Sequence, residues 1–232
     1  MFMLLPIVVA LAAADPAPAA SSAPRPTPLT EIGRVRALPA CVPIVAHANG
    51  AITQALDNDR TLAVLTTNLH NTNFDKLNVV QRKNAIDALM KHAEAMRIAA
   101  SAGDAEVKKL REYAVNSPDP KRKEELKTFA DALGGALYRQ KKAAVELMRD
   151  VSILQGREDN AEARGLMRAA NRVPSYPNAQ AAANTGAIMP GVPDSYNKQF
   201  QGIGDVLDDL TKGIQLDEGT AADHSIAATS GC

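Results

Sequence analysis

The sequence contains no tryptophan, and aromatic residues make up only 3% of its 232 positions. Aromatic side chains bury the most surface per residue, so this chain has few of the groups that usually dominate a core. Alanine instead supplies much of the 46% apolar fraction. Because alanine favours helices but buries little area, the composition predicts a core that is long and thin rather than bulky.

The chain also lacks an excess of charge of either sign. Its 26 Lys and Arg residues balance its 26 Asp and Glu residues. Proteins that bind nucleic acids carry a basic surplus, which displaces counterions from the phosphates. We therefore expect no nucleic-acid partner.

Motifs that carry catalysis or hold cofactors are missing as well. The sequence has no Gly-x-Ser-x-Gly turn, no phosphate-binding loop, no Glu-x-x-His pair for a di-iron centre and no Cys-x-x-Cys-His for haem. The four histidines are His47, His70, His92 and His224. Helical spacing keeps His47 and His70 far apart and does not bring His92 to His47. We expect no catalytic residues, no cofactor and no metal site.

The N-terminus carries a short apolar run, Phe2–Leu11, followed by the small residues Ala12–Ala14. This pattern is typical of a secretory signal peptide and is too short to span a bilayer, although no Lys or Arg precedes it. It predicts a signal peptide over residues 1–14 and a secreted or periplasmic protein. The alternative is a membrane-associated or merely hydrophobic N-terminal segment. Residues 15–38 are rich in Pro, Ala and Ser, which predicts a disordered tether.

Two interleaved seven-residue series dominate the middle of the chain. The first comprises Val79, Ile86, Ala93, Ala100, Val107 and Ala114, and the second comprises Leu89, Met96, Gly103 and Leu110, with Arg82 as an exception. Such series place one apolar stripe on one side of a long helix. The frame keeps its phase on both sides of Gly103, so we expect the helix to continue through that glycine. Asn78 and Gln81 predict a capping box at its start.

Further helices are predicted on either side of this one. A first helix lies between Pro43 and Leu69, where the turn-like Asn49–Gly50 and the polar run 57–60 predict a kink or a break. A third helix follows Ser117–Pro118 and is expected to stop near Gln155–Gly156. These helices predict an all-α fold, an elongated helical bundle of three to four long antiparallel helices with a disordered N-terminal segment and a disordered C-terminal tail.

The predicted organisation continues after the third helix. The predicted segments are a helical bundle over 39–170, an irregular linker over 171–193, an amphipathic helix over 194–216 and a disordered tail over 217–232. The amphipathic helix is acidic and the third helix is basic, so opposite charge predicts that the two dock on each other.

The second and third helices should form a hairpin in which the numbers of facing residues sum to about 237. In that register small residues face small residues over several turns. One interpretation is close packing of the two backbones. The other is a groove that holds a ligand, lined by Ala93, Met96, Ala100, Gly103, Gly134 and Gln140.

Two further features have functional alternatives. The only two cysteines, Cys41 and Cys232, could pair in an oxidising compartment or remain as free or intermolecular thiols. A basic face of the third helix could contact an anionic membrane surface, and its residues are Lys121, Arg122, Lys123 and Lys127.

Taken with the absent motifs, these features predict an exported, non-enzymatic helical bundle that acts by protein binding, scaffolding or self-association in the cell envelope. The alternative function is a carrier of a small hydrophobic ligand or a lipid, which would use the groove between the helices.

Overall fold

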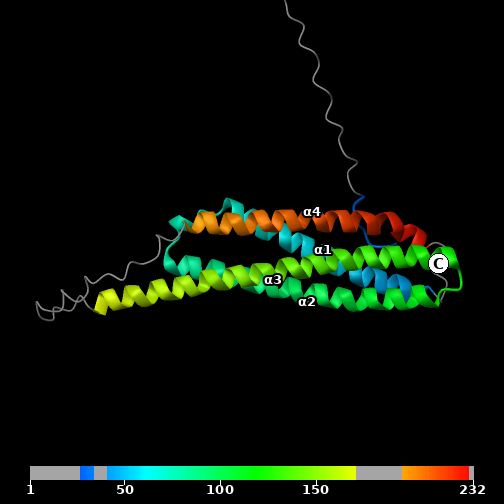
Figure 1. The fold of residues 1–232 in the computed structure, drawn as a ribbon, viewed down its shortest axis with the longest axis horizontal. Helices are drawn as coiled ribbons and strands as arrows, with labels where there is room; N and C mark the ends of the chain where they lie inside the picture. The colour runs from blue at the N-terminus through cyan, green and yellow to red at the C-terminus, as the bar shows by residue number, and fades with distance from the viewer. Residues whose placement is uncertain (1–26, 34–40, 171–194, 230–232) are drawn as a thin grey trace, which may run out of the picture.

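The computed structural model describes residues 27–33, 41–170 and 195–229, with backbone only over 161–170. Within these residues the chain forms four long helices and one short 3-10 turn. They are α1 (Val42–Asn71), η1 (Phe74–Lys76), α2 (Val79–Asn116), α3 (Pro120–Ala170) and α4 (Tyr196–Thr229). The helices lie side by side as a narrow rod in which consecutive helices run in opposite directions (Figure 1). The predicted all-α, elongated bundle is confirmed.

Helix α2 follows the predicted seven-residue pattern without interruption. Its buried residues are Ile86, Leu89, Ala93, Met96, Ala100, Gly103, Val107, Leu110 and Ala114. The helix continues through Gly103, as predicted. Asn78 and Gln81 form the predicted capping box, since each side chain accepts a hydrogen bond from the other residue's backbone N–H.

Helices α2 and α3 form the predicted hairpin, with a shifted register. Arg111 Nε donates to Asp131 Oδ1 at 2.9 Å, and Gly103 faces Leu137. These partners lie about one helical turn further along α3 than the predicted register. The first turn of α3 therefore extends beyond the end of α2, and the two helices begin to pair about one turn later along α3 than predicted.

The contact at Gly103 is closer than a side chain permits. A Cβ atom added there would lie 2.7 Å from Leu137 Cδ2 and 3.3 Å from Gln54 Cβ. Both neighbours belong to other helices, so α1, α2 and α3 all meet at this glycine. The small residue is required by packing and not by backbone conformation.

Substitution of Gly103 by alanine is expected to destabilise the fold by about 1–3 kcal/mol, because the added methyl group overpacks the contact with Leu137. The matched control is Gly156→Ala, where no atom lies within 4 Å of the added Cβ. That variant should be stabilised by about 0.5–1 kcal/mol through higher helix propensity. Urea unfolding followed by circular dichroism measures both, and equal effects of the two substitutions would contradict the packing argument.

The predicted break in α1 and the predicted stop of α3 near Gly156 are wrong, because both helices are continuous. In α1, Asn49 is not a turn residue, because its side-chain amide bonds the backbone N–H of Ile32 at 2.7 Å and the backbone carbonyl of Ile32 at 2.9 Å. Asn58 is buried inside the bundle and does not belong to a solvated turn. Helix α3 passes Gly156 because the buried residues Leu154 and Glu158 anchor it on both sides.

Two predictions of disorder are also wrong over part of their range. Helix α4 continues to Thr229, well beyond residue 216, because buried alanines repeat along its second half. Within the predicted tether, Leu29 is buried in the core and Thr27 donates to Asp223 Oδ1 at 2.6 Å. The predicted signal peptide 1–14, most of the tether and the linker 171–193 lie outside the described residues.

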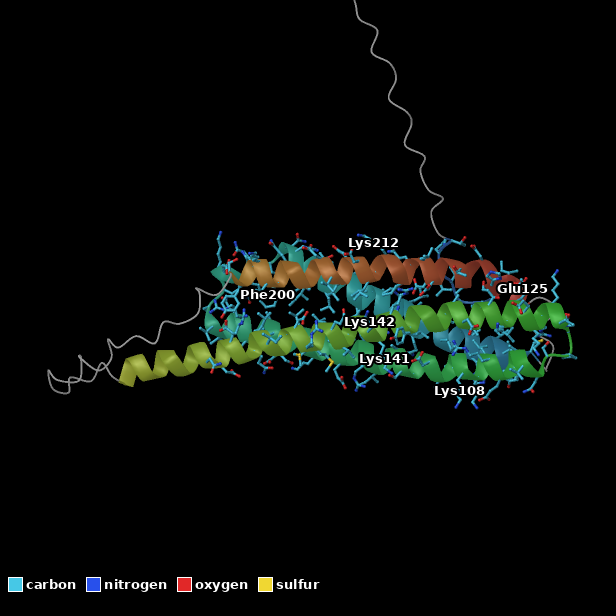
Figure 2. The ribbon with its side chains drawn as sticks, in the orientation of Figure 1. Lys108, Glu125, Lys141, Lys142, Phe200 and Lys212 are labelled. Atoms are coloured by element: carbon cyan, nitrogen blue, oxygen red, sulfur yellow. The ribbon has the colours of Figure 1, made fainter. Side chains whose placement is uncertain are left out.

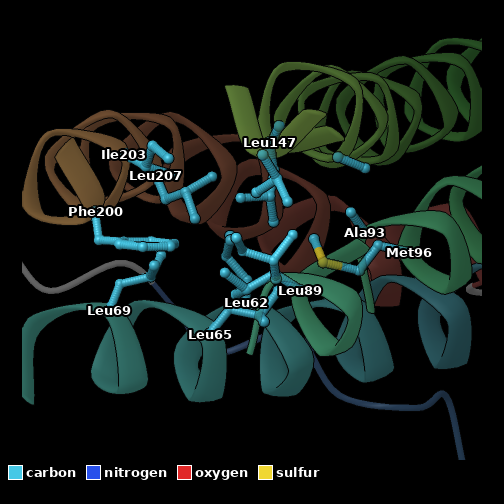
Figure 3. Packing of buried hydrophobic residues seen from close by; sticks show 14 of the residues in the cluster. Leu62, Leu65, Leu69, Leu89, Ala93, Met96, Leu147, Phe200, Ile203 and Leu207 are labelled. Carbon is cyan, nitrogen blue, oxygen red and sulfur yellow. The ribbon is translucent and has the colours of Figure 1, made fainter. Parts of the chain in front are cut away.

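The core consists of two hydrophobic clusters along the rod. The first contains Leu62, Leu65 and Leu69 from α1, Leu89, Ala93 and Met96 from α2, Leu147 from α3, and Phe200, Ile203 and Leu207 from α4 (Figure 3). The second contains Ile52 from α1, Leu110 from α2, Phe129 and Leu133 from α3, and only alanines from α4. In α1, α3 and α4 a buried polar residue separates the two clusters along the helix.

Candidate functional site: a buried polar layer

The polar residues between the two clusters are Asn58, Gln140 and Glu218, which are 2%, 0% and 7% exposed. Gln140 Nε2 donates to the carbonyl of Ala55 at 2.9 Å and to Asp59 Oδ1 at 2.8 Å. Asn58 Nδ2 donates to Gln140 Oε1 at 3.1 Å and to the carbonyl of Met96 at 3.3 Å. These hydrogen bonds connect α1, α2 and α3, and they give the buried amides of Asn58 and Gln140 the partners that buried polar groups need.

Glu218 brings α4 into the same layer. Its Oε1 atom lies 3.5 Å from Gln140 Nε2, so one amide nitrogen faces two carboxyl groups. Burial, followed by a hydrogen bond with Asp59 and the negative charges of Asp59 and Asp217, raises the pKa of Glu218 to about 9. The neighbouring cation Arg139 pairs instead with Asp217, at 2.7 Å. Glu218 is therefore protonated at neutral pH.

A protonated carboxyl beside a second carboxyl can hold and release a proton. Three surface cavities of the described part, of about 180, 200 and 330 Å³, are lined by residues outside this layer. Because Glu218 and Asp59 share one amide donor, the layer is suited to a response to pH. It was not predicted, because the carboxyls of Asp59 and Glu218 belong to residues far apart in the sequence.

The residues of the predicted groove lie inside the bundle. All six are buried, namely Ala93, Met96, Ala100, Gly103, Gly134 and Gln140. Neighbouring side chains fill the space beside the glycines: a Cβ at Gly134 would lie 2.7 Å from Arg111 Nη2 and 3.3 Å from Val107 Cγ1. The close-packing interpretation therefore describes this contact, and Gln140 satisfies its amide within the polar layer.

The residues of the predicted basic face occupy the first two turns of α3. Lys121, Lys123 and Lys127 are exposed, whereas Arg122 is half-buried and donates to Cys41 Sγ at 3.1 Å. Lys123 and Lys127 line the 180 Å³ cavity with the exposed Val115. Contact of this face with an anionic membrane surface stays a prediction.

Cys41 precedes α1, is 2% exposed and is disulfide-bonded. Cys232 lies outside the described residues, so the predicted pairing of these two cysteines stays a prediction.

The predicted docking of α4 on α3 through opposite charge is supported by one contact, whereas a second contact has the opposite polarity. Arg139 of α3 pairs with Asp217 of α4, and His224 Nδ1 of α4 lies 2.7 Å from Glu125 Oε2 of α3. In the second contact the basic group belongs to the acidic helix, so the opposite net charges of the two helices account for only part of the interface. Apolar side chains near the start of α4 complete it.

Three neighbouring side chains in the described residues could each offer a ligand atom to one metal ion, although we expected no metal site. His70 at the end of α1 meets Asp205 and Asp208 of α4, with the three donor atoms within 4.8 Å of one another. His70 Nε2 lies 3.0 Å from Asp208 Oδ2. No sequence motif marks this group, because His70 and the two aspartates belong to helices far apart in the sequence. It is exposed, and we assign no metal to it.

Comparison with known protein families, curated proteins and solved structures finds no match to this chain. Among the described residues, no helix combines the length and the apolar content that crossing a membrane requires. Function must therefore be inferred from the geometry of this chain alone.

Proposed function

We propose that this chain is an exported, non-enzymatic helical bundle that acts by protein binding or scaffolding in the cell envelope. The apolar N-terminal run supports export. The surface between α3 and α4 supports binding: a hollow of about 330 Å³ is lined by Ile153, Leu154 and Ile203 together with the charged Asp150 and Arg157. A small apolar centre with a charged rim is the usual composition of a protein interface.

The shape of α3 adds to this proposal. Its C-terminal end extends past the beginning of α2 and α4, so the rod presents a single helix there (Figure 1). Ile153, which lines the hollow beside Leu154 and Ile203, is 54% exposed and is therefore accessible to a partner. The carrier alternative has no comparable support, because the residues of its predicted groove are buried.

A photo-crosslinking amino acid placed at residue 153 tests this proposal in intact cells that produce the full chain. We expect an adduct of defined mass in the envelope fraction, formed with another protein or with a second copy of the chain. The matched control is residue 138, because Tyr138 lies on the same helix, is 64% exposed and does not line the hollow.

Adducts should form from residue 153 and not from residue 138, and Arg157→Asp should reduce their yield. Equal labelling at both positions, or a chain found only in the cytoplasm, would contradict the proposal.

A further inference from the structure

The two halves of α4 are attached to the bundle with unequal strength. The first half buries large side chains, Phe200, Ile203, Leu207 and Ile214. From residue 218 onward the buried apolar residues are alanines and a glycine, namely Gly219, Ala221, Ala222 and Ala228. Because stabilisation scales with the apolar area removed from water, the second half of α4 should open more easily than the first.

Glu218 stands where the large side chains end and the alanines begin. Its carboxyl meets Gln140 of α3, and Gln140 also donates to Asp59 of α1. We propose that Glu218, Asp59 and Gln140 form a proton-dependent latch, which holds residues 216–229 of α4 against α1 and α3 and releases them as the pH rises.

The negative charges of Asp59 and Asp217 favour the protonated form of Glu218. Asp59 faces it from α1 and Asp217 from its own helix, and the α3 cation Arg139 is occupied by Asp217. From α2, the layer receives only the backbone carbonyl of Met96, through Asn58. Loss of the proton would therefore leave the buried Glu218 carboxylate beside the half-buried Asp59 carboxylate, with one amide group between them, which is a costly arrangement.

The direction of the pH effect follows from the raised pKa of Glu218 in the closed state. When α4 opens, this carboxyl returns to its ordinary pKa of 4.5 from about 9. The closed state thus binds more protons between these values, so the latch is strongest below pH 4.5 and weakens as pH rises towards 9. Between pH 7.5 and 8.5 the opening equilibrium should increase about tenfold.

For a protein that acts by binding, as proposed above, release uncovers an apolar surface. Ala221, Ala222 and Ala228 now cover part of the second core cluster, which includes Leu133 and Leu137 of α3. A rise in pH would offer this surface to a partner. The latch itself can be tested on the isolated chain, so its failure is distinguishable from failure of the binding proposal.

Hydrogen exchange measured by mass spectrometry on the full chain tests the latch. After correction for intrinsic exchange rates, protection of 216–229 should fall about tenfold between pH 7.5 and 8.5, whereas protection of 197–214 should not change.

Three variants complete the experiment. Glu218→Gln should remove the pH dependence. Asp59→Asn should weaken it, because loss of the Asp59 charge lowers the pKa of Glu218 in the closed state and brings it nearer to the value in the open state. The control is Asp209→Asn, because Asp209 is 78% exposed and pairs with Lys212, which lies on the outer side of α4 (Figure 2). It should behave as the wild type. An unchanged pH profile in Glu218→Gln, or equal loss of protection along both halves of α4, would overturn the proposal.

Discussion

Replacing Arg82 by methionine is expected to lower the free energy of unfolding by about 3–5 kcal/mol, since it leaves a buried carboxylate without its cation. Arg82 Nε donates to Glu158 Oε1 at 2.7 Å, and the Glu158 side chain is fully buried. The guanidinium also donates to the carbonyl of Leu77 and lies 4.6 Å from the centroid of the Tyr196 ring. One side chain therefore joins α2, α3 and α4.

The neighbouring ion pair provides the control for this prediction. Lys83 Nζ lies 3.1 Å from Asp159 Oδ1, and the Asp159 side chain is 61% exposed. An exposed pair of this kind contributes about 0–1 kcal/mol, so Lys83→Met should change stability little. The double variant Arg82→Met/Glu158→Leu should recover most of the loss, because it removes both charges. Chemical denaturation of the four proteins at pH 7 makes the comparison. A large loss in Lys83→Met would contradict the argument.

Arg82 shows how far the sequence predicts this fold. The seven-residue pattern correctly assigned one face of α2, and Arg82 stood out as the single position that broke it. A periodic pattern identifies such an exception but not its partner, because Glu158 lies on another helix and no sequence pattern links the two residues. The hairpin register was predicted to within about one turn, which is too coarse to pair individual side chains.

The errors in helix boundaries share a physical cause. Asn49, Asn58 and Gly156 are turn formers in isolation, and local propensity predicted a break at each. In the bundle, Asn49 and Asn58 bond groups on other segments, and packing on both sides of Gly156 exceeds its cost of about 1 kcal/mol. Tertiary contacts that span long stretches of sequence decide these positions.

The polar layer could not be predicted for a related reason. Gln140 and Met96 were both assigned to the predicted groove, and Gln140 does lie beside the Asn58 amide that bonds the Met96 carbonyl. The contribution of Glu218 was missed because residues 217–232 were predicted to be disordered. Alanine-rich helices give a weak apolar signal, although their small side chains allow close helix packing.

Replacement of Phe200 by alanine is expected to cost about 3–5 kcal/mol and to detach the first half of α4. Phe200 is fully buried in the first core cluster (Figure 3). Its ring stacks on that of Phe74 with centroids 3.7 Å apart. Apart from Phe74, the buried residues of this cluster are smaller than phenylalanine, so we expect them not to fill the cavity. Phe200→Leu should cost less, because it retains most of the apolar area.

The matched control for this substitution is Val206→Ala, since Val206 lies on the same helix and is 43% exposed. It should change stability by less than about 0.5 kcal/mol. Limited proteolysis and hydrogen exchange should show that Phe200→Ala opens α4 from its N-terminal end, whereas deprotonation of Glu218 opens it from its C-terminal end. If both changes open the whole helix together, α4 is a single cooperative unit, and the unequal attachment of its two halves does not determine how it is released.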